Sequence, residues 1–567
     1  MTTTPKNPSG GVLPSVAFVN PSVGFSDRRK SKPIGLAYIM AFLAEHGFSS
    51  KGFDFGDSED DAIFLAETYG LDQFDVVGFS VYNESFLQAI RMAEWVRSKR
   101  PDALIVFGGP HATAVHEHVV TKYAVVDCVV RREGEEPMLE LLSRFGDRAA
   151  QRTVAGTTWR DPNGGPPIVN AERAFVKDLD QLPYPDAEFV SHSGYPESTY
   201  FDEVQGVLKP ALTICSSRSC PYDCSFCGVL TIGRKYRSRD AERVVDELFY
   251  FRKRDGKNYS HVYFSDANFF VSPMRALAIA RALHEADPTV SFSFGTRVNQ
   301  ILRAKHVLPE LKACGLRFIE LGIESASPAV LTRLAKHVPP QMNVAAVRLL
   351  KQLGIEVSID FIMLDPASTL DDVEANLHFL RDNGFYDYVP HDHLYTSLVL
   401  YEGTPIRKFY EERYGVTFDP DLLPSSAELF EIPEVMRFSA ELRRFRREYQ
   451  GRIDDVLALV EIATNELAHQ DDVCDESLAR LQLDAVSLRH APNLFFANLL
   501  ADAKTGFRLL DAKGFSALLP TVGRGAVSLP VLLARAESSA RAFGTFDAPV
   551  MSGTGRDAQR NESYSSR

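Results

Sequence analysis

The 567-residue chain has no run of 18 or more apolar residues, which excludes a transmembrane helix. It also has no excess of positive charge: a net charge of −13 at pH 7 excludes unaided binding to nucleic acid or to an anionic membrane. Residues Met1 to Lys6 lack the apolar segment of a secretory signal peptide. Cysteine is scarce, and its odd total of seven does not suit a disulfide framework. We therefore expect a cytoplasmic protein with no membrane span and no nucleic-acid partner.

Three of the cysteines stand in one short motif, Cys220-x3-Cys224-x2-Cys227. Thiolates at this spacing fit on one tight loop and can ligate three irons of a [4Fe–4S] cluster, which leaves the fourth iron open. The alternative is a zinc knuckle or a set of buried thiols. Structural zinc sites take four ligands, typically as two separated pairs, and no second pair lies nearby. Cys215 lies in an apolar stretch and is predicted to be strand interior rather than a ligand.

The motif resembles that of the radical S-adenosylmethionine (radical SAM) superfamily, in which SAM chelates the fourth iron. Strand and helix patterns alternate from Ala211 onward, with a helix predicted over Ala241–Arg252. Six βα units resemble the partial (β/α)6 barrel of that superfamily, whose active face is lined by polar residues at the carboxyl ends of the strands. After the first strand, the predicted strands are His261–Phe264, Ser291–Thr296, Phe318–Leu321, Val357–Met363 and Asp392–Leu400.

The resemblance also implies a set of SAM contacts. Phe226, just before the third cysteine, would offer its backbone to the adenine. Glu324 would be a polar contact, Lys336 would face the SAM carboxylate, and Asp360 would lie near the ribose or the amino group. Arg297 would be a further contact. A charged residue of this kind, taken singly, is more often a solvated surface charge; the places of Glu324, Lys336 and Asp360 at successive strand ends favour the binding role for these three.

The N-terminal region alternates short apolar runs with helical patterns, which predicts βαβ units on a parallel sheet. Helices are expected over Ile34–His46 and Ser85–Ser98. The predicted strands are Val16–Val19, Lys51–Phe55, Val76–Ser80, Leu104–Phe107 and Val125–Val130. In such Rossmann-like (flavodoxin-like) sheets, ligands bind beyond the carboxyl ends of the strands.

Two loops at those ends resemble the cobalamin-binding domain that precedes the barrel in one large class of radical SAM enzymes. They are Gly108-Gly109-Pro110 after the fourth strand and Glu133-Gly134-Glu135 after the fifth. Paired glycines let the backbone approach a flat corrin or its nucleotide tail. The glycine pair alone could be a plain strand-to-helix turn. The second motif usually has glycine where this chain has Arg132.

No histidine occurs in the first loop, Asn20–Ser26, where corrinoid mutases carry a cobalt ligand. We therefore expect cobalamin to bind without a protein imidazole on cobalt. The segment containing Ser80, Tyr82 and Asn83 should pass beneath the corrin. His111, His116 and His118 fall where the resemblance implies no cobalt ligand.

The predicted domain organisation follows from these patterns. Residues 1–11 form a tail, 12–155 the Rossmann-like cobalamin-binding domain, and 156–205 a linker rich in proline and glycine. Residues 206–410 form the partial TIM barrel, 411–547 a mainly helical C-terminal domain, and 548–567 a disordered tail. Helical patterns are expected over Glu428–Ala468 and Glu476–Leu510.

As a whole the chain resembles the cobalamin-dependent radical SAM methyltransferases. The resemblance implies three cofactors, a [4Fe–4S] cluster, SAM and cobalamin (as methylcobalamin), and methylation of an unactivated carbon, less often of phosphorus. It also implies an electron donor such as flavodoxin or ferredoxin and a small-molecule or peptide-derived substrate, with antibiotic or other secondary metabolism favoured. Three alternatives stay open: another reaction on the same scaffold (cyclisation, ring contraction or oxidation), a non-radical cobalamin methyltransferase, and a cobalamin sensor without catalysis. The sequence identifies no catalytic side chain.

Overall fold

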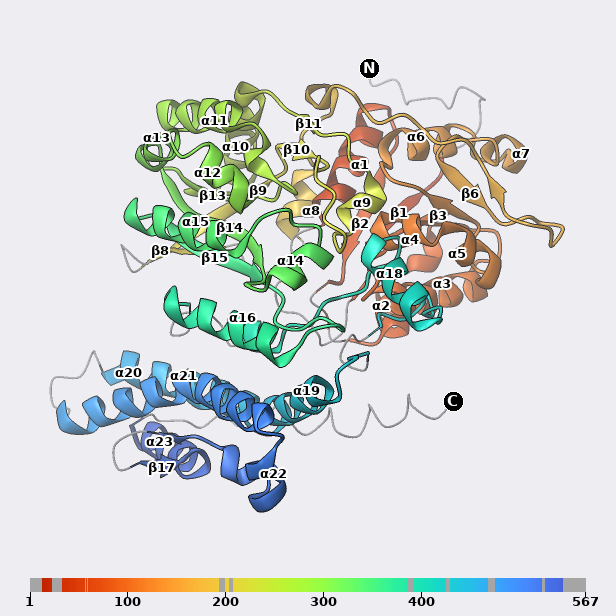
Figure 1. The fold of residues 1–567 in the computed structure, drawn as a ribbon. Helices are drawn as coiled ribbons and strands as arrows, with labels where there is room; N and C mark the ends of the chain where they lie inside the picture. Colours follow the sequence, from red (N-terminus) through yellow and green to blue (C-terminus); the bar gives the residue numbers. More distant parts are fainter. Residues whose placement is uncertain are drawn as a thin grey trace. The chain divides into compact units, whose positions relative to one another are not determined.

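The computed structural model describes residues 13–22, 33–56, 58, 60–192, 199–202, 207–385, 392–424, 429–467, 475–522 and 526–543 (Figure 1). The predicted tails, residues 1–11 and 548–567, lie outside these ranges, as do residues 23–26 of the first loop. The chain divides into two compact units. The first comprises residues 1–323, 332–360 and 399–424, and the second comprises residues 324–331, 361–398 and 425–567.

The first unit contains a sheet in the order β2-β1-β3-β4-β5-β6-β7. Its first five strands pair in parallel, which is the flavodoxin-like order predicted from the sequence. These strands are β1 Val16–Asn20, β2 Ser50–Asp54, β3 Val76–Ser80, β4 Leu104–Gly108 and β5 Cys128–Val130. Strands of a parallel sheet covered on both faces are apolar throughout, and β1, β3 and β4 are buried along almost their whole length.

The side chains of this sheet point alternately to its two faces, because successive residues of a strand point to opposite sides. Ala17, Val77 and Ile105 pack in a core with α2 Ala62–Thr68 and α3 Phe86–Lys99. The opposite face carries α1 Ile34–Glu45 and α6 Glu135–Ser143, which contact each other. α1 and α3 agree with the two predicted helices, whereas α2 and α6 were not predicted. α2 begins where the Asp61 side chain accepts a hydrogen bond from the Ile63 amide.

The predicted linker, residues 156–205, contains more regular structure than its composition suggests. β6 Thr157–Trp159 and β7 Ile168–Val169 extend the first sheet in antiparallel fashion. The physical reason is burial: Trp159 is 2% exposed, so the first turn-rich segment closes the edge of the sheet beside β5. The later part contains α8 Ala187–His192 and β8 Thr199–Asp202.

A second sheet in the order β15-β14-β13-β12-β9-β8 forms the other part of the first unit. β9, β12, β13 and β14 pair in parallel, and β8 lies antiparallel on the outer edge. The strands are β9 Val207–Ile214, β12 His261–Phe264, β13 Ser291–Arg297, β14 Leu316–Glu324 and β15 Glu356–Phe361. The helices α10 Ala241–Asp255, α11 Pro273–Ala286 and α15 Pro340–Gln352 come between them, which is the predicted partial-barrel pattern.

The predicted sixth barrel strand, Asp392–Leu400, is wrong as a full strand. Its first residues form the short helix α17 Asp392–Tyr395. The rest meets the chain after β15 through one isolated parallel bridge between Leu364 and Ser397. The backbone hydrogen bonds there run from Leu364 N to Thr396 O and from Leu398 N to Leu364 O. The helical turn uses the residues that would have lengthened the strand.

The second unit is mainly helical, as predicted. α20 Gly451–Leu467, α21 Asp475–Lys504 and α23 Leu529–Phe543 contact one another, and α19 Pro433–Phe445 packs on α21. Aromatic rings fill this core: Phe445 stacks on Phe495 with ring centroids 4.2 Å apart. None of the helices within the described ranges combines the length and the apolar character needed to cross a bilayer.

Candidate cofactor-binding site

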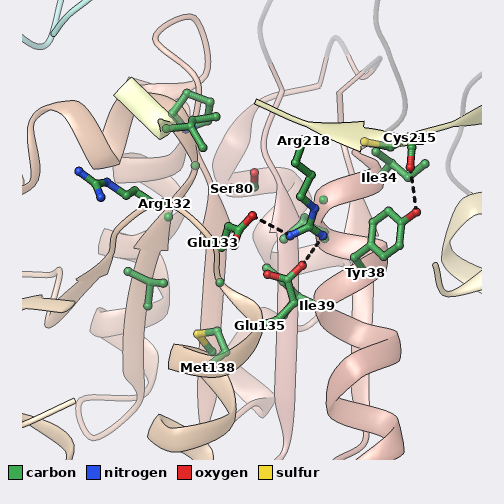
Figure 2. Close-up of a pocket in the computed structure, with 18 of the residues that line it drawn as sticks. Ile34, Tyr38, Ile39, Ser80, Arg132, Glu133, Glu135, Met138, Cys215 and Arg218 are labelled. Atoms are coloured by element: carbon green, nitrogen blue, oxygen red, sulfur yellow. Dashed lines mark hydrogen bonds and ion pairs between the residues drawn. The ribbon is translucent and has the colours of Figure 1, made fainter. Parts of the chain in front are cut away.

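A cavity of about 330 Å³ lies inside the first unit, between the carboxyl ends of the strands of the first sheet and the residues that follow β9 and β12 of the second sheet (Figure 2). From the first sheet and its helices, the wall includes Tyr38, Ser80, Tyr82, Gly108, Gly109 and Glu135. From the chain that follows β9, it includes Cys215, Ser217, Arg218, Ser219 and Arg237. The cavity therefore joins the two sequence regions that carry the predicted cofactor motifs.

Gly108 and Gly109 form a part of this wall that has no side chain. Gly109 has φ +91°, and a Cβ there would lie 2.8 Å from both the amide nitrogen and the carbonyl oxygen of Val81. The two backbones cross closely: Val81 N donates to Gly108 O at 2.8 Å, and His111 N donates to Val81 O at 3.2 Å. A glycine is needed for this conformation and this approach. Pro110 follows at the start of α4 Gly109–Ala114, so the pair also serves as the strand-to-helix turn.

Residues Arg132 to Glu135 form the neighbouring part of the wall, after β5. Arg132 has φ +66°, the left-handed conformation that favours glycine. The backbone at this position therefore has a glycine-like conformation, although an arginine occupies the place where the motif usually has glycine. Gly134 packs against α1, since a Cβ there would lie 2.7 Å from Ile39 Cδ1. Glu133 and Glu135 point toward Arg218, and both bind it (Figure 2).

Ser80 and Tyr82 also lie in the wall, as the sequence predicts for the region beneath a corrin. Tyr82 is 46% exposed, and because it lines the cavity we take this surface to face the hollow rather than bulk solvent. Surrounding protein raises the pKa of Tyr82 through desolvation, with Glu84 adding to the effect. Asn83 is placed differently: it is 7% exposed and is not part of the wall.

The three histidines considered above do not line the cavity. His111 packs on the Phe86 ring, and burial lowers its pKa to about 4. The His116 Nδ1 lies 3.0 Å from Thr158 Oγ1, and the His118 Nε2 lies 2.8 Å from Asp421 Oδ1. Of the first loop, the described residues Asn20 and Ser22 use their side chains to bind Asp54 and the Ser58 carbonyl.

These positions lead to a spectroscopic prediction. Protein reconstituted with cob(II)alamin should give cobalt electron paramagnetic resonance lines without nitrogen splitting, because no imidazole among the described residues lines the cavity. Tyr82→His is the positive control, since it places an imidazole in the wall and should split each line. A triplet in the unsubstituted protein that disappears on replacing His111, His116 or His118 would contradict the assignment.

The cysteine loop begins directly after the cavity wall. Cys220, Cys224 and Cys227 are not joined in disulfides and are partly exposed. The loop is fixed by its backbone: Cys227 N donates to Cys224 O at 3.1 Å, and Ser225 N donates to Leu334 O at 3.0 Å. Three thiols on one ordered loop suit an iron–sulfur cluster, and Ser219, which precedes them, has the left-handed φ of +66°.

Cys215 differs from these three. It comes immediately after the last residue of β9 rather than inside the strand, and its thiol donates to Ser217 O at 3.2 Å. Burial raises its pKa to about 12, so it is a poor source of thiolate. Its place in the cavity wall, not on the cysteine loop, agrees with its exclusion as a cluster ligand.

The predicted SAM contacts fall into two groups. Arg297, at the end of β13, donates to Cys224 Sγ and to the Lys336 carbonyl, and its guanidinium lies 4.2 Å from the Tyr222 ring centroid. The structure therefore brings Arg297, the backbone of Lys336 and the cysteine loop together. Phe226 is part of that loop.

The other two predicted contacts are at strand ends. Glu324 is the last residue of β14, is 6% exposed and has φ +64°. Asp360 lies on β15 and is exposed. Asp360 helps to raise the pKa of Tyr263, after burial and Glu320, and the Tyr263 hydroxyl donates to Glu320 at 2.8 Å. A polar group of tyrosine and carboxylates thus lies across β12, β14 and β15.

Sequence reasoning missed several residues that fix the site. Asp266, which follows β12, accepts hydrogen bonds from the amides and hydroxyls of Ser216 and Ser217 at 2.6–3.0 Å. Arg218 and Arg237 bind the glutamates of the second motif. The signal available in the sequence was the place of Arg218, a charged residue two positions before the first cysteine of the motif.

Comparison with known proteins identifies both halves of this site. The model of the B12 binding domain matches residues 25–142, and the model of the radical SAM superfamily matches residues 214–380. The chain belongs to the cobalamin-dependent radical SAM enzymes. The family predicted from the sequence is confirmed, and its cofactors are a [4Fe–4S] cluster, SAM and cobalamin. The residues present fit these groups: three thiols on one loop, and a glycine-walled cavity beside it.

Several curated proteins are similar to this enzyme. An uncharacterized methyltransferase of Pyrococcus horikoshii is 27% identical over 62% of this chain and 73% of its own length. The anaerobic magnesium-protoporphyrin IX monomethyl ester cyclase of Rubrivivax gelatinosus is 26% identical over 76% of this chain and 77% of its own. The hopanoid C-3 methylase of Methylococcus capsulatus is 28% identical over 58% and 61%.

A solved structure shows the same fold. The cobalamin-dependent SAM radical enzyme OxsB, with aqua-cobalamin bound, superposes with a TM-score of 0.64 at 18% identity. The match covers 93% of this chain and 84% of OxsB. The predicted fold class of a Rossmann-like domain, a radical SAM barrel and a helical C-terminal region is confirmed.

Proposed function

We propose that this enzyme transfers a methyl group from SAM, by way of cobalamin, to an unactivated carbon of a natural-product intermediate; phosphorus is the less favoured acceptor. The observation that carries the proposal is the shared cavity of about 330 Å³. Its wall is built from the strand ends of the B12-binding fold and from the residues that lead into the cysteine loop. Cobalamin in this cavity would lie beside the SAM-binding part of the same unit.

The chain's own residues would hold and orient the cofactors. Cys220, Cys224 and Cys227 would ligate the cluster, and Arg297 would fix the loop through Cys224 and the Lys336 carbonyl. The reduced cluster supplies cleavage of SAM to an organic radical that abstracts a substrate hydrogen, and cobalamin supplies the methyl group. Lys336, 3% exposed, would place its cation near the SAM carboxylate.

On the cobalamin side, Gly108 and Gly109 would admit the corrin or its tail to the backbone, and Tyr82 would line the same cavity. An ordinary tyrosine hydroxyl keeps its proton at neutral pH, and desolvation raises the pKa of Tyr82 further. A neutral phenol is a weak metal ligand compared with imidazole or phenolate. The cavity would thus leave the lower face of cobalt without a strong donor, which suits repeated gain and loss of a methyl group.

The names of the similar proteins leave two reaction types in view. Two of them are called a methyltransferase and a methylase, and one a cyclase. We favour methylation of a small-molecule or peptide-derived intermediate, as in antibiotic or other secondary metabolism. The reaction would take place in the cytoplasm, with flavodoxin or ferredoxin as electron donor.

The test uses the full-length enzyme, reconstituted anaerobically with iron, sulfide and hydroxocobalamin, then reduced and given SAM with a labelled methyl group. We expect label on the bound cobalamin and release of S-adenosylhomocysteine before any substrate is added. Addition of a candidate substrate should move the label to product. Both readouts follow the methyl group itself, so the substrate does not have to be known at the start.

A cyclase-type reaction predicts a different pattern. It would release 5′-deoxyadenosine without S-adenosylhomocysteine and without label on cobalamin, and that outcome would contradict the proposed methyl transfer. The matched control is the same protein reconstituted without hydroxocobalamin, which should release no S-adenosylhomocysteine.

A further inference from the structure

A short two-stranded ribbon flanks the cysteine loop, with one strand before it and one after it, and carries two arginines side by side. β10 Ser217–Arg218 and β11 Arg237–Ser238 pair in antiparallel fashion, and Arg218 lies directly opposite Arg237. Like charges at directly opposite positions destabilise a pair of strands. The ribbon therefore needs anions from elsewhere in the unit.

Glu133 and Glu135 of the B12-binding fold supply these anions. Glu133 Oε1 lies 3.2 Å from Arg218 Nη1 and 2.7 Å from Arg237 Nη1, so one carboxylate joins both arginines. Glu135 Oε1 lies 2.6 Å from Arg218 Nη2. The side chains of Glu135 and Arg237 are 3% and 5% exposed, so these ion pairs are shielded from solvent. We call these four residues the arginine–glutamate clamp.

Further contacts make the clamp rigid. Glu133 Oε2 accepts a hydrogen bond from the Val176 amide at 2.9 Å, and Arg237 Nη1 donates to the Val176 carbonyl at 2.8 Å. The Arg218 guanidinium lies 5.3 Å from the centroid of the Tyr38 ring on α1. All four charged residues of the clamp line the cavity. Arg218 is at the same time two residues before Cys220.

We propose that the arginine–glutamate clamp couples the cavity to the cysteine loop, with Arg218 as the positioning residue. The inference rests on the proposed binding of cobalamin in the cavity. Arg218 and Glu133 are still 18% and 12% exposed, so a ligand that fills the cavity removes the remaining water from their ion pair, and ion pairs strengthen when water is excluded. Stronger ion pairs hold the ribbon, and hence the start of the cysteine loop, in one position. Glu133 and Glu135 thereby act on cobalamin through Arg218 rather than as its direct ligands.

The coupling can be measured by hydrogen exchange on the full-length enzyme, with and without hydroxocobalamin. In the unsubstituted enzyme, cobalamin should slow exchange both at residues 104–111, in the cavity wall, and at residues 217–227, in the ribbon and cysteine loop. Coupling between linked sites is typically about 5- to 150-fold. In Arg218→Met the slowing at 104–111 should remain, whereas the slowing at 217–227 should fall below about fivefold.

Two further variants separate positioning from general destabilisation. Glu135→Gln keeps the size of the side chain and should show the same selective loss. Arg218→Lys keeps the charge but not the forked geometry, and should restore part of the slowing. The matched control is Asp287→Asn: Asp287 lies just after α11, pairs with Arg252 at 2.8 Å and is not in the cavity wall. In this control variant, cobalamin should still slow hydrogen exchange both at residues 104–111 and at residues 217–227.

The result that overturns the inference is full slowing at residues 217–227 in both Arg218→Met and Glu135→Gln. Loss of slowing at both regions in these variants would also overturn it, because the clamp would then serve binding and not coupling. Failure of the proposed function looks different: the unsubstituted enzyme would show no cobalamin-dependent slowing at residues 104–111.

Discussion

Replacing Cys220, Cys224 and Cys227 together by alanine is expected to abolish the cluster and with it all cleavage of SAM. Thiolates are the usual ligands of such clusters, and the three cysteines lie on one loop whose backbone is fixed by Ser225 and by the Cys224–Cys227 hydrogen bond. Anaerobically reconstituted variant should lack bound iron, lack absorption near about 400 nm, and form no 5′-deoxyadenosine.

The control is Cys215→Ala. Cys215 is in the cavity wall, and its raised pKa makes it a poor thiolate, so its removal should leave the iron content unchanged. If the triple variant kept its iron, or if the unsubstituted protein bound zinc in place of iron, the assignment of the loop to a cluster would be wrong.

Gly109→Ala is the second change with a large expected effect. The left-handed conformation costs a non-glycine residue roughly 1–2 kcal/mol. In addition, the new Cβ would lie 2.8 Å from two backbone atoms of Val81, so the backbone must move, at a further cost of about 1–3 kcal/mol. We expect loss of about 2–5 kcal/mol of unfolding free energy and severe loss of cobalamin uptake, because the shifted backbone forms the cavity wall.

Gly146→Ala separates the two causes. Gly146 has φ +93°, close to the +91° of Gly109, but a Cβ there meets nothing within 4 Å. It should therefore show only the conformational cost of roughly 1–2 kcal/mol and should bind cobalamin normally. Denaturant unfolding and equilibrium binding of hydroxocobalamin measure both quantities. If Gly109→Ala and Gly146→Ala lost the same unfolding free energy and bound hydroxocobalamin equally well, the close crossing with Val81 would not be important.

Local patterns predicted most of the fold because apolar runs of strand length and helical periodicity are strong signals. β1 to β5 and the barrel strands β12 to β15 begin and end within a few residues of their predicted bounds. Two parts of the fold were not predicted correctly. β6 and β7 lie in a segment rich in turn residues, where the buried strand β6 is only three residues long, and the first residues of the predicted sixth strand form a helical turn.

The site was predicted less completely. The cysteine motif and the glycine pair are local in sequence, so their roles could be inferred from spacing. Arg218 and Glu133 are 85 positions apart, and nothing in either segment indicates that they meet. The sequence predicts the two glutamates as cofactor contacts; the structure places both in the cavity wall and adds arginine partners that the sequence did not indicate. Arg132 could not be predicted for a different reason: its backbone has a left-handed conformation that favours glycine, and an arginine in the sequence gives no sign of it.

The central claim is that cobalamin occupies the cavity beside the cysteine loop. Anomalous diffraction at the cobalt edge, from crystals of the anaerobically reconstituted enzyme, locates cobalt directly. We predict one cobalt peak in the cavity whose wall contains Ser80, Tyr82, Gly109 and Ser217. A cobalt peak elsewhere, for example at the side-chain group formed by His118, Asp419 and Asp421, with none in the cavity, would contradict the account.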